Sequence, residues 1–249
     1  MLKIENLSVG YGEKTVLRDV TMTLPRGSLT AVVGPNGCGK STLFKTVLGI
    51  LPSLFGTVLL DEAPLATMKR AEIARRVSYL SQSKRLPDMT VFEMVLQGRF
   101  PHLSPFSHYG EEDRAIARSA MEKMGLLPFA ETPLSHLSGG EAQRAFVAMA
   151  LAQKTDVLLA DEPTSFLDAQ NAHALFKTLR ALASEGKTVA VVSHDLPLAF
   201  RLADRVAVFA GGGLLAFDTP ERVLASCAVE KAFGVPLAYS DEAGYYYRY

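Results

Sequence analysis

The sequence predicts an α/β fold with a largely parallel central sheet. Short apolar runs rich in β-branched residues occur at 29–33, 157–160 and 188–192, which is typical of strands buried on both faces. Segments with helical spacing separate these runs, and strands that alternate with helices usually form a parallel sheet covered by helices. A chain of 249 residues, 48% of them hydrophobic, is long enough for one such domain with an inserted subdomain.

The first part of the chain contains strands that lead to a glycine-rich turn. Residues 2–9 and 15–24 have partly alternating strand patterns, and the apolar run 29–33 ends at Gly34. Residues 41–51 then have helical spacing, and we expect Pro52 to end that helix.

The middle of the chain is predicted to be helical. Amphipathic patterns cover 91–98 and 111–125 within a longer helical region from about 86 to 154, which we interpret as an inserted subdomain. The sheet pattern resumes after it, and we expect a last strand at 205–209 followed by a turn at 211–213.

We therefore predict one domain over residues 1–249. Its core spans 1–84 and 156–225, its helical subdomain 85–155, and its C-terminal tail 226–249. Residues 245–249 of the tail are mostly tyrosine, and they could cover a neighbouring protein or pack on their own domain. We favour packing on the same domain, because burial is the common use of aromatic side chains.

Composition narrows the classes of function. The formal net charge is zero, whereas a nucleic-acid-binding protein usually has a basic excess. Two cysteines, Cys38 and Cys227, form neither a disulfide framework nor a CxxC pair, which indicates a reducing compartment. We find no signal peptide and no apolar run of about 18 residues, so we expect a soluble cytoplasmic protein.

A phosphate-binding loop is the clearest chemical motif. Residues 34–41 match the G-x-x-x-x-G-K-[ST] pattern between a strand and a helix. Glycines let backbone N–H groups surround a phosphate, Lys40 supplies a positive charge at a solvent-facing site, and the Ser41 hydroxyl can bind Mg²⁺. The predicted ATP-binding residues are Gly34, Pro35, Asn36, Gly37, Cys38, Gly39, Lys40, Ser41 and Thr42.

An acidic pair ends the apolar run at 157–160. In α/β sheets, ligands bind at the carboxyl ends of the strands, so Asp161 and Glu162 are expected beside the phosphate loop. We predict that Asp161 holds Mg²⁺ through water and that Glu162 orients or deprotonates the attacking water.

A second glycine motif distinguishes between families with a phosphate loop. The segment Leu137, Ser138, Gly139, Gly140 and Glu141 resembles the signature motif of ABC ATPases, the ATP-hydrolysing subunits of ABC transporters. Ser138 and Glu141 also have the spacing of a capping box at a helix start. A capping box alone does not explain the two glycines, which leave backbone N–H groups accessible to a phosphate.

Other residues match this family in the same order along the chain. The resemblance implies that Tyr11 stacks on adenine, that Gln82 senses Mg²⁺ and the permease, and that His194 contacts the γ-phosphate. It also makes Asp168 part of the D-loop, which crosses a dimer interface. The catalytic residues implied are Glu162, His194 and Gln82, and the Mg²⁺ ligands Ser41, Gln82 and Asp161.

The family's mechanism follows as an implication of the resemblance. Two copies of the chain would sandwich two ATP molecules with Mg²⁺, each site using one chain's phosphate loop and the other's signature motif. The fold would be a P-loop core with an N-terminal antiparallel β subdomain and an inserted α-helical subdomain. The partners would be a second copy, transmembrane permease subunits at the cytoplasmic face of the membrane, and indirectly a substrate-binding protein, with no nucleic acid.

The segment 97–102, Gln-Gly-Arg-Phe-Pro-His, looks like a stretch found in ATPases of iron–siderophore, haem and cobalamin importers. It could also be simply a surface turn, and His102 is isolated from other metal ligands. We expect the helical subdomain, with Gln82 and Arg99, to dock on the permease. The alternatives are an ABC ATPase for zinc or manganese, a soluble ABC protein acting on DNA or ribosomes, and a nucleotide switch without hydrolysis.

Overall fold

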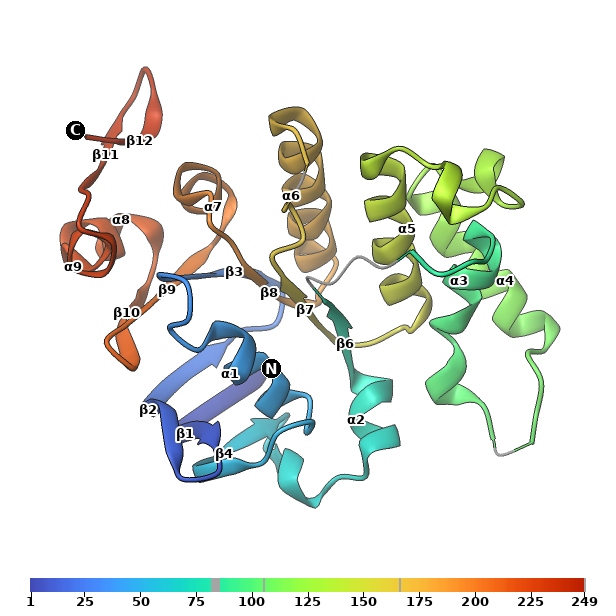
Figure 1. Ribbon diagram of the computed structural model, residues 1–249, viewed down its shortest axis with the longest axis horizontal. Coiled ribbons are helices and arrows are strands. Elements are labelled where there is room, and N and C mark those ends of the chain that lie inside the picture. Colours follow the sequence, from blue (N-terminus) through green and yellow to red (C-terminus); the bar gives the residue numbers. More distant parts are fainter. Residues whose placement is uncertain (82–85, 105, 166, 249) are drawn as a thin grey trace.

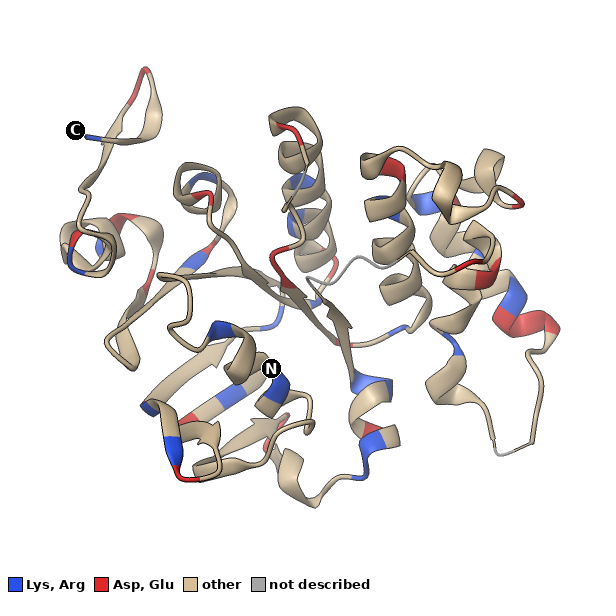
Figure 2. Ribbon diagram, in the orientation of Figure 1, with Lys and Arg blue, Asp and Glu red and all other residues tan. Residues whose placement is uncertain are grey.

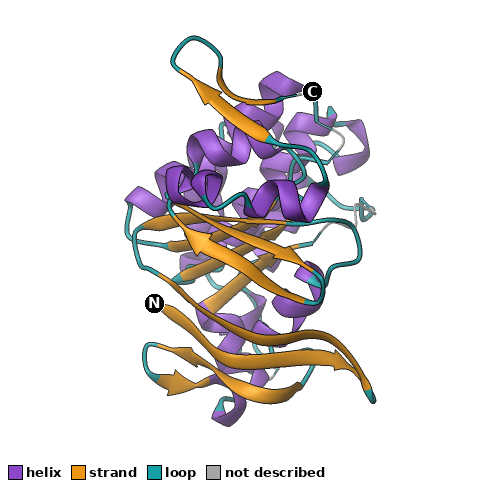
Figure 3. Ribbon diagram, turned by 90° about the vertical axis from the view of Figure 1, so that its left-hand side faces the viewer, coloured by secondary structure: helices purple, strands orange, loops and turns teal. Residues whose placement is uncertain are grey.

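The computed structural model describes residues 1–81, 86–104, 106–165 and 167–248. Its sheets and helices lie in layers, with an antiparallel sheet at one side, a larger sheet in the centre and helices beyond it (Figure 3). No helix in the described part of the chain combines the length and hydropathy that crossing a bilayer requires.

The central sheet is largely parallel, as the apolar runs predict. Its strand order is β10-β9-β3-β8-β7-β6, and only the edge strand β10 runs antiparallel to its neighbour. Both faces are covered, since Ala31 and Val33 pack into one core while Val32 packs into the other. The strands are β3 (Ser28–Val33), β6 (Val77–Leu80), β7 (Val157–Asp161), β8 (Thr188–Val192), β9 (Arg205–Ala210) and β10 (Gly213–Asp218).

The N-terminal sheet is antiparallel, which confirms the predicted β subdomain. Its strand order is β2-β1-β4-β5, and helix α1 lies between it and the central sheet (Figure 1). Leu43 and Phe44 of α1 join the core between the two sheets. The elements are β1 (Leu2–Tyr11), β2 (Lys14–Leu24), α1 (Lys40–Val47), β4 (Ser53–Leu60) and β5 (Ala63–Pro64).

The remaining helices form two groups. Helices α3, α4 and α5 pack together beyond β6, whereas α6 and α7 cover the face of the central sheet opposite α1 (Figure 1). The helices are α2 (Arg70–Arg76), α3 (Val91–Gln97), α4 (Glu111–Lys123), α5 (Gly139–Ala152), α6 (Ala169–Ser184), α7 (Leu196–Leu202), α8 (Pro220–Ala225) and α9 (Ala228–Phe233). Short 3₁₀ turns occur at Leu65–Thr67, Phe100–His102, Leu127–Phe129 and Leu134–His136.

Two predicted boundaries are wrong. Helix α1 ends at Val47, before Pro52, because Gly49 adopts φ +67° and the Ile50 N–H turns back to the Lys45 carbonyl. The glycine turn is also shorter than expected, since Gly213 already pairs with Ala210 as the first residue of β10.

Arg99, which we expected to take part in docking, is buried, with 7% of the residue exposed. Its Nε donates to Asp113 Oδ1 on α4 at 3.0 Å, and its Nη1 donates to the Ala152 carbonyl at the end of α5 at 2.9 Å. Arg99 therefore joins three helices, and a change there would affect the fold. Phe100, the next residue, is the exposed one.

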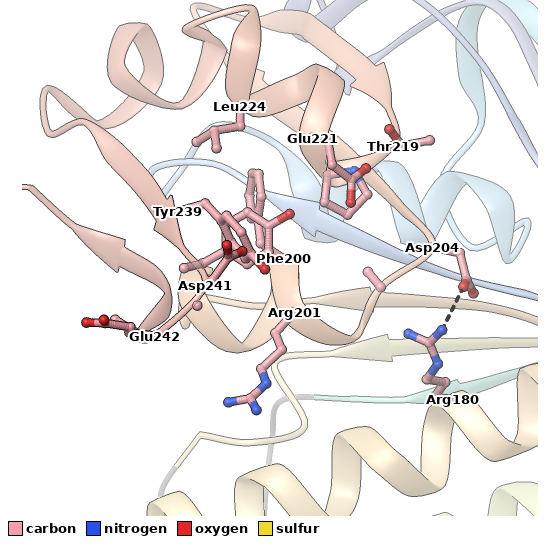
Figure 4. Close-up of a pocket in the computed structure, with 15 residues that line it drawn as sticks. Arg180, Phe200, Arg201, Asp204, Thr219, Glu221, Leu224, Tyr239, Asp241 and Glu242 are labelled. Carbon is pink, nitrogen blue, oxygen red and sulfur yellow. Dashed lines mark ion pairs between the residues drawn. The ribbon is translucent and has the colours of Figure 1, made fainter.

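The C-terminal tail ends in a hairpin that packs on its own domain, as we favoured. Strands β11 (Leu237–Ser240) and β12 (Gly244–Tyr247) pair antiparallel, and the Tyr245 ring lies 5.4 Å from Phe200 of α7 and 5.0 Å from Tyr239. Figure 4 shows the cavity of about 790 Å³ that this hairpin borders with α7 and α8. The phosphate loop does not line it.

Lys and Arg are interspersed with Asp and Glu along the ribbon (Figure 2). Around Asp61, several charged groups lie close enough to one another to affect stability. Asp61 Oδ1 accepts from the N-terminal amine at 2.7 Å, while its Oδ2 accepts from Arg26 at 2.8 Å and from Arg76 at 2.5 Å. Hydrogen bonds from Arg26 and then from the N-terminal amine lower the pKa of Asp61 to about 2. The carboxylate thus joins the start of β1 to α2.

Asp61→Asn should lower the free energy of unfolding by about 1 kcal/mol at pH 7, after allowance for partial solvent screening. Because the folded pKa is below the unfolded value of 3.8, this contribution is nearly complete above about pH 5 and is lost as the pH falls through 2. Urea unfolding of both proteins at pH 7 and pH 3 measures it. The difference should shrink to about half at pH 3, and an unchanged difference would refute the electrostatic explanation.

Candidate functional site

The phosphate loop leaves the carboxyl end of β3 and enters α1, as the motif predicts. A Cβ on Gly34 would lie 2.3 Å from the Phe209 carbonyl oxygen, so the loop starts against β9 without room for a side chain. Gly39 caps α1 with φ +106° and touches Leu17 and Val16 of β2. Only glycine combines this φ with so close a contact, and the first turn of α1 is thereby open to an anion.

Lys40 lies inside the loop and is 5% exposed, although we expected a solvent-facing position. Its Nζ donates to the Gly34 carbonyl at 2.7 Å and to the Pro35 carbonyl at 3.0 Å, and it lies 3.8 Å from Cys38 Sγ. The lysine therefore bridges the loop from within.

Asp161 is the last residue of β7 and is buried. Its Oδ2 accepts from the Tyr79 hydroxyl at 3.0 Å, while its Oδ1 is buried without a hydrogen-bond partner among the described residues. Burial and the nearby carboxylate raise the pKa of Tyr79 above its usual range, so Tyr79 stays a donor. The sequence analysis did not assign Tyr79 to the site, because its contact with Asp161 depends on the pairing of β6 with β7.

Glu162 follows directly and adopts φ +49°, which is unusual for a residue with a side chain. Its Oε1 lies 2.5 Å from His194 Nε2, and its Oε2 accepts from Ser165 Oγ at 3.2 Å. The glutamate is thus held between His194 and the turn before α6. Ser165 opens the segment that resembles the D-loop, and its contact with Glu162 was not predicted from the sequence.

These segments meet because their strands are adjacent and in register. Val32 of β3 pairs with Val192 of β8, which pairs with Asp161 of β7, so the three carboxyl ends are level. A cavity of about 610 Å³ opens there. Its lining residues are Asn36, Gly37, Gly39, Lys40, Ser41, Thr42, Glu162, Ser165 and His194.

Tyr11, Asp168 and the signature residues, which the structure describes, do not line this cavity. Tyr11 ends β1 and is 50% exposed, and Asp168 is the N-cap of α6. Ser138 caps α5: its Oγ accepts from the Glu141 N–H at 3.4 Å and its own N–H donates to Glu141 Oε2 at 2.8 Å, which confirms the capping box. Gln82 lies outside the described residues. Within the signature segment 137–141, Ser138 and Gly139 are exposed, and no residue of the segment lines the cavity at its own chain's phosphate loop.

Comparison with known proteins places the chain in a family. The ABC transporter family model matches residues 17–165. The chain is 38% identical to the iron(3+)-hydroxamate import ATP-binding protein FhuC of Bacillus subtilis over 94% of this chain and 88% of that protein. It is 37% identical to the ferric enterobactin transport ATP-binding protein FepC of Escherichia coli K12 over 97% and 90%, respectively.

A solved structure gives the same result. A metal-chelate-type ABC transporter in an inward-facing conformation matches with a TM-score of 0.85 and 26% identity, over 100% of this chain and 97% of that one. The chain belongs to the ABC transporter family and is an ABC ATPase. ATP binding follows from membership of this family.

Proposed function

We propose that the chain is the ATP-hydrolysing subunit of an importer for iron–siderophore complexes, working with Mg²⁺. One observation carries the ATPase chemistry: a single cavity brings Lys40 and Ser41 together with Glu162 and His194. The cargo rests on resemblance to relatives that are themselves named for hydroxamate and enterobactin transport.

The residues at the cavity suit MgATP. Lys40 would exchange its two carbonyl contacts for β- and γ-phosphate oxygens, and Ser41 would hold Mg²⁺ directly. The unpartnered Oδ1 of Asp161 supports a role in binding Mg²⁺ through water, since buried polar atoms rarely lack a partner. When bound, Mg²⁺ neutralises charge on the phosphates.

Glu162 is the group that we assign to the attacking water. Its carboxylate borders the cavity and is oriented from both sides by His194 and Ser165. A base so placed can accept a proton as water attacks, and the His194 imidazole can then contact the γ-phosphate. The roles of Tyr11 on adenine and of Gln82 with Mg²⁺ and the permease remain part of this proposal.

We further propose that the active form is a head-to-tail dimer. The signature segment, exposed at Ser138 and Gly139, starts a capped 14-residue helix whose first N–H groups suit an anion, yet none of its residues lines the cavity at its own phosphate loop. In a dimer, the signature segment would contact the γ-phosphate of the ATP bound to the phosphate loop of the second copy. A bacterial ABC transporter cassette that is 28% identical, with a TM-score of 0.76, forms a dimer in its solved structure.

The remaining partners would be permease subunits at the cytoplasmic face of a membrane and, through them, a substrate-binding protein. Phe100 and its 3₁₀ turn offer an exposed aromatic contact on the helical subdomain, where we had expected Arg99. The ATP-binding proteins of a manganese and a zinc transport system are also similar, at 32% and 36% identity, so a metal-ion cargo is the second candidate.

Transport by the native complex tests the cargo. The tagged chain is purified with its permease, reconstituted with the binding protein, and assayed for ATP-dependent uptake of radiolabelled ferric hydroxamate, zinc and manganese. We expect uptake of the iron chelate only, abolished by Glu162→Gln. Uptake of zinc or manganese without the chelate would replace the cargo assignment and leave the ATPase assignment intact.

A further inference from the structure

The two glycines of the signature segment have different surroundings within their own chain. A Cβ on Gly139 would meet nothing within 4 Å. A Cβ on Gly140 would lie 2.8 Å from Oδ1 and 3.0 Å from Cγ of Asn171, in the first turn of α6. Gly140 therefore permits close contact between α5 and α6, in addition to any approach by a phosphate.

Asn171 is not free to move away from that contact. Its backbone N–H donates to Asp168 Oδ1 at 2.7 Å, and its side-chain Nδ2 donates to Asp168 Oδ2 at 3.0 Å. Rotation of the amide away from Gly140 would break the second bond. The D-loop aspartate thus holds Asn171 against the signature helix.

Packing beside this contact is incomplete. A cavity of about 40 Å³ lies between the two helices, bordered by Gly140 and Gln143 from α5 and by Asn171 and Leu175 from α6. A void of this kind contributes few dispersion contacts that could fix the helix separation. The Asn171 amide is the rigid spacer at this point.

We propose that Asn171 is a positioning residue that fixes the distance between the signature segment 137–141 and Asp168. The inference rests on the proposed dimer, in which both segments face the partner chain. With Asn171 in place, the two segments form one preorganised surface. Without it, each would have to be ordered when the dimer forms, at a cost in affinity.

The contact itself is tested on the monomer by a double-mutant cycle. Alanine is the better helix former, so Gly139→Ala should keep or raise the melting temperature. Gly140→Ala should instead lower it by about 2–4 °C, and Asn171→Ala should restore it in the double variant. If Gly139→Ala and Gly140→Ala behave alike, or Asn171→Ala gives no rescue, the contact does not set the spacing.

The positioning role is tested in the Glu162→Gln background by sedimentation with ATP. Asn171→Ala should weaken ATP-dependent dimerisation about tenfold while leaving monomer affinity for ATP and the melting temperature nearly unchanged. Gln170 is exposed and precedes Asn171 in the same helix, so Gln170→Ala is the matched control. It should leave dimerisation unchanged.

The outcomes separate the two proposals. Unchanged dimerisation of Asn171→Ala, with a dimerising Glu162→Gln parent, would overturn the role of Asn171 only. A parent that does not dimerise with ATP would remove the proposed dimer and, with it, this inference. If Asn171→Ala lowers the melting temperature but dimerises as well as its parent, Asn171 contributes to the stability of the fold and not to dimerisation.

Discussion

Replacing Glu162 with glutamine should lower the steady-state rate of ATP hydrolysis at least about a hundredfold and leave ATP binding intact. Glutamine keeps the size of the side chain and can still contact His194 and Ser165, which lie 2.5 Å and 3.2 Å from the carboxylate oxygens. The variant loses only the charge and the ability to accept the proton of the attacking water.

Phosphate release and ATP titration measure the two quantities separately. Glu230→Gln, an exposed change of the same kind on α9, is the matched control and should hydrolyse at the parent rate. Hydrolysis by Glu162→Gln within a factor of about two of the parent would make Glu162 a strand-end residue without a catalytic role. An inactive parent would favour the nucleotide switch without hydrolysis.

Lys40→Ala should weaken ATP binding at least about thirtyfold, because a buried charge that contacts phosphate oxygens is lost. The variant also frees the Gly34 and Pro35 carbonyls, so the loop loses its internal bridge. Circular dichroism should still report a folded protein, since the affected backbone is confined to the loop.

Lys45 is an exposed lysine on the same helix, so Lys45→Ala controls for the effect of removing one positive charge from α1. Lys45→Ala should bind ATP with the parent affinity. Equal affinities of the Lys40→Ala and parent proteins in calorimetry would contradict the assignment of the loop as the ATP site.

Local patterns predicted the elements that carry the site. The apolar runs located β3, β7 and β8, and the Ser138–Glu141 spacing placed the capping box correctly. The level carboxyl ends of adjacent parallel strands then bring the phosphate loop, Glu162 and His194 together. Short-range sequence signals are enough to predict the site here, because the parallel register of the strands places the residues that follow them at the same edge of the sheet.

Long-range contacts account for what sequence reasoning missed. Arg99 appears as part of a polar, exposed turn, and only the fold brings Asp113 and the Ala152 carbonyl to it. Tyr79 and Asp161 are 82 residues apart in sequence. Similarly, nothing in the sequence separates the roles of Gly139 and Gly140. The difference arises because Asn171 of α6 packs against Gly140 and not against Gly139 in the folded chain.

Sedimentation of the Glu162→Gln protein with ATP, with and without Ser138→Arg, tests the central claim of a composite ATP site most directly. The single variant should dimerise with ATP. The double variant should bind ATP as a monomer and fail to dimerise, because the introduced arginine side chain would occupy the place of the partner's phosphate, whereas Ser119→Arg on α4 should dimerise normally. Loss of ATP binding by the Ser138→Arg monomer, or full dimerisation of the double variant, would contradict a signature segment that completes the partner's site.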